Sequence, residues 1–275
     1  MPQLRWILAL VSLFVGILGA SAATSSTNLT ATPSASARPV ATRKFVDYAH
    51  PLRDYFSRRV SGWSVLVEQE MLDKDPATAK KAIARLEVKL KEVRDVLPSH
   101  AVRRLQSVPI FLMFGEQSTH DGKSEGAQFF AQAAPRYFKN LDPRMGGSVV
   151  IYSAKHFNSM TEFGSLKLLL HELSHAWHLE QWSENRADIL MAYNSAKDKG
   201  LYRNVRKSDG TNLEETYATV NHLEYFAELS CIWFTGNDHF PFDRGDLKLY
   251  DQSGYDLVRK LWSENGGNEQ PLVKK

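Results

Sequence analysis

Two histidines lie four residues apart in the segment His171-Glu172-Leu173-Ser174-His175, which has the form HExxH. Positions with this spacing differ by roughly 40° around a helix, so both imidazoles would point the same way. Such a pair can bind one Zn²⁺ ion, and the carboxylate of Glu172 beside them can act as a general base toward water at the metal. A Lewis acid, a nucleophile formed near neutral pH and a general base are what hydrolysis of a peptide bond requires.

A second acidic segment offers a third ligand, which a zinc site of this kind needs. The stretch from His222 to Phe234 is apolar on most faces when drawn as a helix, and Glu224 and Glu228 are its only charges. Burying two carboxylates in such a helix is costly unless a cation or hydrogen-bond donors neutralise them. We expect Glu224 to bind the metal and Glu228 to accept a hydrogen bond from a ligand imidazole. The alternative is that both carboxylates pair with Arg or Lys across an interface.

Taken together, these segments resemble the lethal-factor and Pro-Pro endopeptidase type of gluzincin, a family of zinc metallopeptidases. The resemblance rests on HExxH, on Glu224 within EYFAE 49 residues after His175, and on Tyr217 seven residues before Glu224. It covers only about residues 165–240, so it implies no particular substrate. Motif order between Gly62 and Trp262 is also similar to that of uncharacterised exported bacterial HExxH proteins. The gluzincin resemblance implies one Zn²⁺ per chain, with this set of residues: ligands His171, His175 and Glu224, general base Glu172, oxyanion-facing Tyr217 and supporting Glu228.

Three further side chains near these motifs have competing interpretations. The phenol of Tyr217 could stabilise a developing oxyanion, or its ring could simply pack beneath Trp233. His178 follows His175 by three residues, and its reach diverges from a shared metal, so we expect it to face solvent or to support the site. We interpret Cys231 as a small apolar residue of the buried helix.

The elements that must position these residues follow from periodicity and turn signals. Apolar residues at helical spacing predict a helix after Ser165 as N-cap, and another from Pro76 to Leu97. Strands are predicted at 62–68, 108–114 and 148–153, whereas the sequence pattern of the polar stretch 115–147 predicts no particular secondary structure. Pro109 favours an edge strand or a first strand position. The strand at 148–153 could be a sheet edge on which an extended peptide binds, provided that it is not paired on both sides.

Strands followed by helices predict an α+β fold. The expected architecture is a zincin-like metallopeptidase domain: a small mixed sheet, then an active-site helix and a mainly helical C-terminal part. Residues 1–22 are expected to be a signal peptide and 23–43 a disordered Ser/Thr/Ala/Pro-rich linker. Residues 44–275 would form one domain, with a strand-containing lobe at 44–163 and a helical metal-binding lobe at 164–275. The expected location is periplasmic or extracellular, and a signal retained as a membrane anchor is the alternative.

Composition limits the function classes. A net charge of +3, with basic and acidic residues interspersed, argues against nucleic acid as a partner. The single cysteine excludes an intrachain disulfide and a Cys-based zinc finger. We therefore expect a secreted zinc metallopeptidase that acts on a peptide or protein substrate, without stable membrane insertion once the signal is removed. The rivals are a non-catalytic exported binding protein with a structural zinc site, and a metal-free adhesin-like domain with a chance HExxH.

Overall fold

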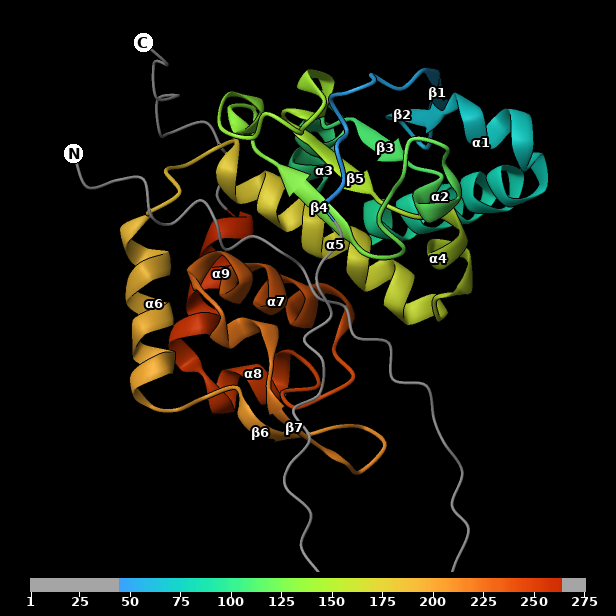
Figure 1. The fold of residues 1–275 in the computed structure, drawn as a ribbon. Coiled ribbons are helices and arrows are strands. Elements are labelled where there is room, and N and C mark those ends of the chain that lie inside the picture. The colour runs from blue at the N-terminus through green and yellow to red at the C-terminus, as the bar shows by residue number, and fades with distance from the viewer. Residues whose placement is uncertain (1–44, 264–275) are drawn as a thin grey trace, which may run out of the picture.

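A computed structural model describes residues 45–263 of the chain (Figure 1). The expected signal peptide at 1–22 and linker at 23–43 lie outside these described residues. Within the described range, every helix is too short or too polar to cross a bilayer.

One mixed sheet forms the first half of the fold. Its strand order is β1-β2-β3-β5-β4, in which the central pairs β2–β3 and β3–β5 are parallel and the outer pairs β1–β2 and β4–β5 are antiparallel. The strands are β1 (Tyr55–Val60), β2 (Trp63–Glu68), β3 (Ile110–Leu112), β4 (Ala127–Phe130) and β5 (Ser148–Ile151).

One expectation about sheet edges was wrong, and for Pro109 the structure favours a place at the start of a strand over an edge strand. Strand β5 is not an edge, because it pairs with β3 on one side and with β4 on the other. Strand β4, from the polar stretch for which no element was predicted, is the edge instead. Strand β3 is also central, because Pro109 lies just before it, where a missing N–H breaks no ladder bond. The carbonyl of Pro109 still accepts from the Val149 N–H at 2.9 Å.

Two long helices cover one face of the sheet (Figure 1). Helix α2 (Pro76–Val96) begins at Pro76 as predicted, capped by the Asp75 carboxylate, which accepts from the Thr78 N–H. Helix α5 (Glu162–Leu179) carries the HExxH segment and begins earlier than predicted. Thr161 is its N-cap, so Ser165 lies within the helix and its hydroxyl donates to the Thr161 carbonyl. The remaining helices of this half are shorter: α1 (Gln69–Lys74), α3 (Ser99–Leu105) and α4 (Ala154–Ser159).

The C-terminal part is mainly helical and packs on the other side of α5 (Figure 1). The Trp177 ring of α5 stacks on Trp262, with ring centroids 5.1 Å apart, which joins this part to the main core. The elements here are α6 (Ala187–Asp198), the ribbon of β6 (Arg203–Arg206) and β7 (Asn212–Glu215), α7 (His222–Thr235), α8 (Arg244–Tyr250) and α9 (Gln252–Ser263). The described residues thus form an α+β fold with a small mixed sheet and a mostly helical C-terminal part.

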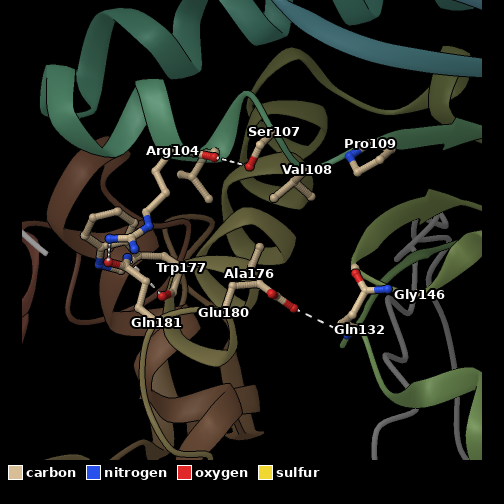
Figure 2. Close-up of a pocket in the computed structure, with 12 residues that line it drawn as sticks. Arg104, Ser107, Val108, Pro109, Gln132, Gly146, Ala176, Trp177, Glu180 and Gln181 are labelled. Atoms are coloured by element: carbon tan, nitrogen blue, oxygen red, sulfur yellow. Dashed lines mark hydrogen bonds between the residues drawn. The ribbon is translucent and has the colours of Figure 1, made fainter. Parts of the chain in front are cut away.

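A cavity of about 340 Å³ lies at one end of the sheet, between α3, the starts of β3 and β5, the end of β4 and the last turn of α5 (Figure 2). Its walls include Leu105, Val108 and Ala176, and the exposed side chains of Arg104 and Glu180 lie at its rim. The end of β4 is tied to α5 here, because the Gln132 N–H donates to the Glu180 carboxylate at 3.3 Å.

Candidate metal centre

Two buried helices bring the candidate ligands together. Helix α7 begins at His222 because the Asn221 side chain accepts from the backbone N–H groups of Leu223 and Glu224, at 2.8 and 2.9 Å. This cap places Glu224 in the first turn of α7, facing the middle of α5. The prediction that the His222–Phe234 segment is a buried helix is confirmed, since all its residues from Leu223 to Ile232 are buried.

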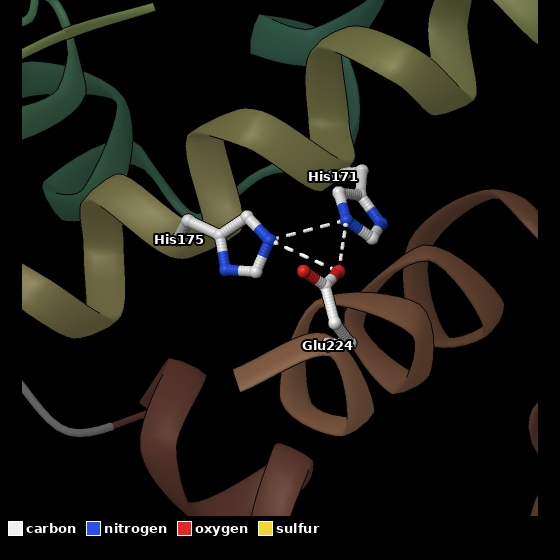
Figure 3. Close-up of side chains that lie close together, drawn as sticks. All are labelled: His171, His175 and Glu224. Atoms are coloured by element: carbon white, nitrogen blue, oxygen red, sulfur yellow. Dashed lines mark hydrogen bonds and ion pairs between the residues drawn. The ribbon is translucent and has the colours of Figure 1, made fainter. Parts of the chain in front are cut away.

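His171 and His175 from α5 converge with Glu224 from α7 (Figure 3). Glu224 Oε2 lies 2.9 Å from His171 Nε2 and 3.3 Å from His175 Nε2, and the two Nε2 atoms are 3.1 Å apart. All three side chains are about 2% exposed. The group could therefore hold a metal ion between three atoms that are almost withdrawn from solvent.

The donor atoms of this triad suit a tetrahedral ion. Metal–ligand bonds near 2.0–2.1 Å with tetrahedral angles separate neighbouring ligands by roughly 3.3 Å, close to the spacings of the three atoms. The carboxylate of Glu228 lies 3.0 Å from His171 Nδ1, so a neutral ring that donates to Glu228 carries its proton on Nδ1 and turns the Nε2 lone pair toward Glu224. Lone pairs that converge in this way repel one another unless a proton or a metal ion lies between them.

The alternative of pairing with basic residues holds for one of the two carboxylates. Glu228 Oε2 accepts from the ammonium of Lys167 at 3.0 Å, and Lys167 also donates to Asn237 Oδ1 at 2.9 Å. The ionic partners of Glu224 in the described structure are His171 and His175. Glu224 thus meets imidazoles alone, while Glu228 joins an imidazole to a lysine.

Charge balance at the centre requires additional positive charge. Three buried carboxylates, Glu172, Glu224 and Glu228, face one buried ammonium, Lys167, so two negative charges are left when the histidines are neutral. Burial opposes a charge on His171, yet contacts that include Glu224 and Glu228 raise its pKa well above the ordinary value. Burial would raise the pKa of Glu224, but the neighbouring imidazoles hold it far below its usual range. Two protons on the imidazoles, or one divalent ion, would neutralise the group.

Glu172 lies on a different side of α5, against the edge strand. Its Oε2 accepts from the Phe129 N–H of β4 at 2.7 Å, and its side chain is buried. Burial raises the pKa of this carboxyl, which favours a group that can take up and release a proton. Sequence reasoning placed Glu172 beside the histidines, but it missed this backbone partner.

Tyr217 lies in the 3₁₀ turn Tyr217–Thr219, shortly before α7, and is half-buried. Its ring packs edge-on against His171, with centroids 6.4 Å apart. Trp233, beneath which the alternative placed it, instead contacts Tyr255 and Arg244. The structure therefore brings Tyr217 to the same imidazole as Glu224 and Glu228.

His178 does not face solvent, contrary to one expectation. It is fully buried against Phe226 of α7, because α7 and the turn after α5 cover this side of the helix. One ring nitrogen bonds the Ser183 carbonyl at 3.2 Å, and burial lowers its pKa to about 3. His178 is not part of the convergent triad. Cys231 is fully buried in the main core, as expected for a small apolar residue, but its thiol also donates to the Lys167 carbonyl at 3.7 Å and contacts His171.

Lys167 is the side chain at this centre that sequence reasoning missed. It precedes His171 by four residues, so the helical spacing that joins His171 to His175 also places Lys167 on their face. A lysine on an otherwise apolar helix is usually expected to be exposed to solvent, whereas Lys167 is only 6% exposed.

In comparisons with protein-family models, with curated proteins and with solved structures, nothing matches this chain. Two imidazoles and a carboxylate converge at metal-binding distances, and a second carboxylate, Glu172, is held at the edge of the sheet one residue after His171.

Proposed function

We propose that this protein is an exported zinc-dependent metallopeptidase that hydrolyses peptide bonds, with Glu172 as the general base. The observation that carries the proposal is the convergence of His171 Nε2, His175 Nε2 and Glu224 Oε2 beside a carboxylate that is not part of the ligand set. Two nitrogens and one carboxylate oxygen are a donor set that suits zinc. Zinc in such a site supplies Lewis acidity toward a carbonyl and toward water.

Glu172 would move the proton. Its carboxylate takes a proton from the attacking water as the C–O bond forms, and it returns that proton to the amine nitrogen as the C–N bond breaks. The Phe129 N–H holds Oε2, which fixes the side chain and leaves Oε1 for the reaction. Tyr217, packed against His171, would donate its phenol proton in a hydrogen bond to the developing oxyanion.

The edge of β4 would bind the substrate as an added strand. The carbonyls of Gly126 and Phe130 accept from the Tyr152 and Gly147 N–H groups beside β5, so the backbone groups of Ala127 and Phe129 point away from β5. The Phe129 N–H is already bonded to Glu172, so the groups left for a peptide are those of Ala127 and the carbonyl of Phe129. A peptide that pairs with this edge passes Glu172, which is bonded to Phe129. Main-chain hydrogen bonds would supply affinity regardless of the peptide's sequence.

The cavity at the end of β4 would select a side chain of that peptide (Figure 2). Ala176 in its wall lies one turn after Glu172 on the same side of α5, so the cavity begins about two strand residues from the base. Apolar and polar groups line its walls in about equal parts, and the opposite charges of Arg104 and Glu180 at its rim offset each other. We therefore expect it to accept an uncharged side chain.

A structural zinc site in a non-catalytic exported binding protein is the second candidate. The almost complete burial of the three ligands favours it, because a metal there would join α5 to α7. Against it, structural zinc sites have four protein ligands, and the convergent group has three.

The test is hydrolysis of a mixture of random peptides by zinc-loaded protein, followed by mass spectrometry of the products. We expect new termini with the wild-type protein and none with Glu172→Gln. Cleavage that is equal in both proteins would contradict the role of Glu172. A zinc-loaded wild-type protein that cuts nothing would favour the structural site.

A further inference from the structure

Lys167 is a buried cation that the proposed reaction does not use. It lies in the second turn of α5 and is 6% exposed, and its ammonium has two partners on other segments. One is the carboxylate of Glu228 in α7 at 3.0 Å, and the other is the side-chain oxygen of Asn237 after the end of α7 at 2.9 Å. A lysine is rarely buried to this extent unless its charge is paired with an acidic group.

The contacts of Lys167 continue to the metal centre through one carboxylate. Glu228 receives Lys167 on Oε2 and His171 Nδ1 on Oε1, at 3.0 Å each. The opposite nitrogen of the same ring, His171 Nε2, belongs to the convergent triad. Four groups thus lie in series: Asn237, Lys167, Glu228 and His171.

We infer that Lys167 is a positioning residue for the metal centre, and that it acts through Glu228. With both carboxylate oxygens engaged, Glu228 cannot rotate away from His171, so the ring keeps its orientation and its Nδ1–H tautomer. The ammonium also offsets the charge of Glu228, which would otherwise add a third unpaired anion to those of Glu172 and Glu224. The inference rests on the metal-binding part of the proposed function, and it does not depend on which substrate is cleaved.

A structural interpretation competes with this one. Lys167 could serve only to join α5 to α7, as many buried ion pairs join two helices. The two interpretations differ in metal affinity, because a packing contact stabilises the fold without setting the orientation of one imidazole. Mutating a residue that hydrogen-bonds a ligand histidine typically weakens metal binding 10- to 100-fold.

The chain offers a matched control in Lys89 on α2. It is 3% exposed and is paired with Glu92 and Glu162, at 3.0 and 2.8 Å, and helix α2 lies on the far side of α5 from α7 (Figure 1). Lys89→Met removes a buried, paired lysine as Lys167→Met does, and its ionic partners Glu92 and Glu162 are not part of the metal centre. Any loss that both variants share is a loss of stability and not of positioning.

The experiment measures Zn²⁺ affinity of the full chain by competition with a chromophoric chelator, and the visible spectrum of the Co²⁺-loaded protein. We expect Lys167→Met to bind Zn²⁺ roughly 10- to 100-fold more weakly than the wild type and to show a changed Co²⁺ spectrum. Lys89→Met should match the wild type in both, and Lys167→Arg, which keeps the charge, should recover most of the affinity. Equal affinity in Lys167→Met and Lys89→Met would overturn the inference.

A double variant tests whether Lys167 acts through Glu228. Adding Lys167→Met to Glu228→Gln should weaken Zn²⁺ binding no further than Glu228→Gln alone, because the series is already broken. Independent, multiplying losses would overturn the inference. If Lys167→Met does not fold, Asn237→Ala tests the same series, with a smaller loss of affinity expected and an unchanged affinity contradicting it. A wild-type protein that takes up no Zn²⁺ would overturn the proposed function together with this inference. If the wild type binds Zn²⁺ and Lys167→Met binds it with the same affinity, the inference alone is overturned.

Discussion

The backbone N–H of Phe129 donates a hydrogen bond to Glu172 Oε2 over 2.7 Å, which joins the edge strand of the sheet to the HExxH helix. This contact places the proposed base where an added peptide strand would pass. It also gives Glu172 a reason for its position that is independent of metal binding, since a buried N–H needs an acceptor. The edge strand and the base are therefore parts of one arrangement.

The Phe129 contact predicts different stabilities for two variants of Glu172. In Glu172→Gln the amide oxygen can still accept from Phe129, so the free energy of unfolding should stay close to that of the wild type. In Glu172→Ala the buried N–H has no acceptor, which costs about 1–3 kcal/mol. Urea unfolding of the metal-free proteins measures both values. Equal stability of the two variants would show that the contact contributes nothing.

Removing the phenol of Tyr217 should slow catalysis without affecting the metal. Tyr217→Phe keeps the ring against His171, so metal content and melting temperature should be unchanged. Loss of one oxyanion donor typically lowers kcat by about 10²- to 10³-fold. Steady-state kinetics on a peptide identified from the random mixture measures the change. A kcat within twofold of the wild type would exclude this role for Tyr217.

Narrowing the cavity at the end of β4 should change which peptides are cut. Ala176→Leu places a larger side chain in its wall and should slow hydrolysis of peptides with large uncharged residues by roughly tenfold or more. Peptides with small residues should be cut as before. The matched control is Ala192→Leu, in a separate cavity of about 290 Å³ between α6 and α9. If both variants cut the same peptides, the cavity at the end of β4 does not select the substrate.

The helices and the convergent ligands were accessible from sequence, for physical reasons. Helical period alone places His171 and His175 on one side of α5, and the cost of burying Glu224 in an apolar helix indicates a cation before any tertiary contact is known. Those local rules apply because α5 and α7 are long and apolar. The structure adds that His171, His175 and Glu224 meet within hydrogen-bonding distances.

The edge strand and the lysine were not accessible in this way. Strand β4 is four residues long, Ala127–Phe130, within a polar stretch, and its pairing with β5 rather than its own pattern makes it a strand. Without β4, the strand Ser148–Ile151 is mistaken for the edge of the sheet. Lys167 has the right spacing from His171, but its burial depends on Glu228 and Asn237, which lie 61 and 70 residues away.

Buried His178 should make stability depend on pH in the acidic range. Burial lowers its folded-state pKa to about 3 from an ordinary value of 6.5, so between these values the unfolded chain binds a proton that the folded chain does not. Stability from this residue is therefore complete above pH 6.5 and falls as the pH decreases, by at most about 1.4 kcal/mol per pH unit.

Replacing His178 tests this dependence. Metal-free His178→Gln should lose less stability than the wild type between pH 6.5 and pH 4, in urea unfolding at each pH. The variant His50→Gln is the control, because the His50 side chain is 78% exposed. If all three proteins lose stability in parallel, His178 is not the group responsible.

Elemental analysis of purified protein after exhaustive dialysis tests the central claim most directly. The account predicts about one zinc per chain in the wild type, and loss of that zinc in His175→Ala and Glu224→Ala. His178→Gln should keep its zinc, since this neighbouring buried histidine lies outside the triad. A well-folded wild-type protein that neither contains zinc nor takes it up would contradict the account, because the buried carboxylates would then be neutralised by protons on the imidazoles.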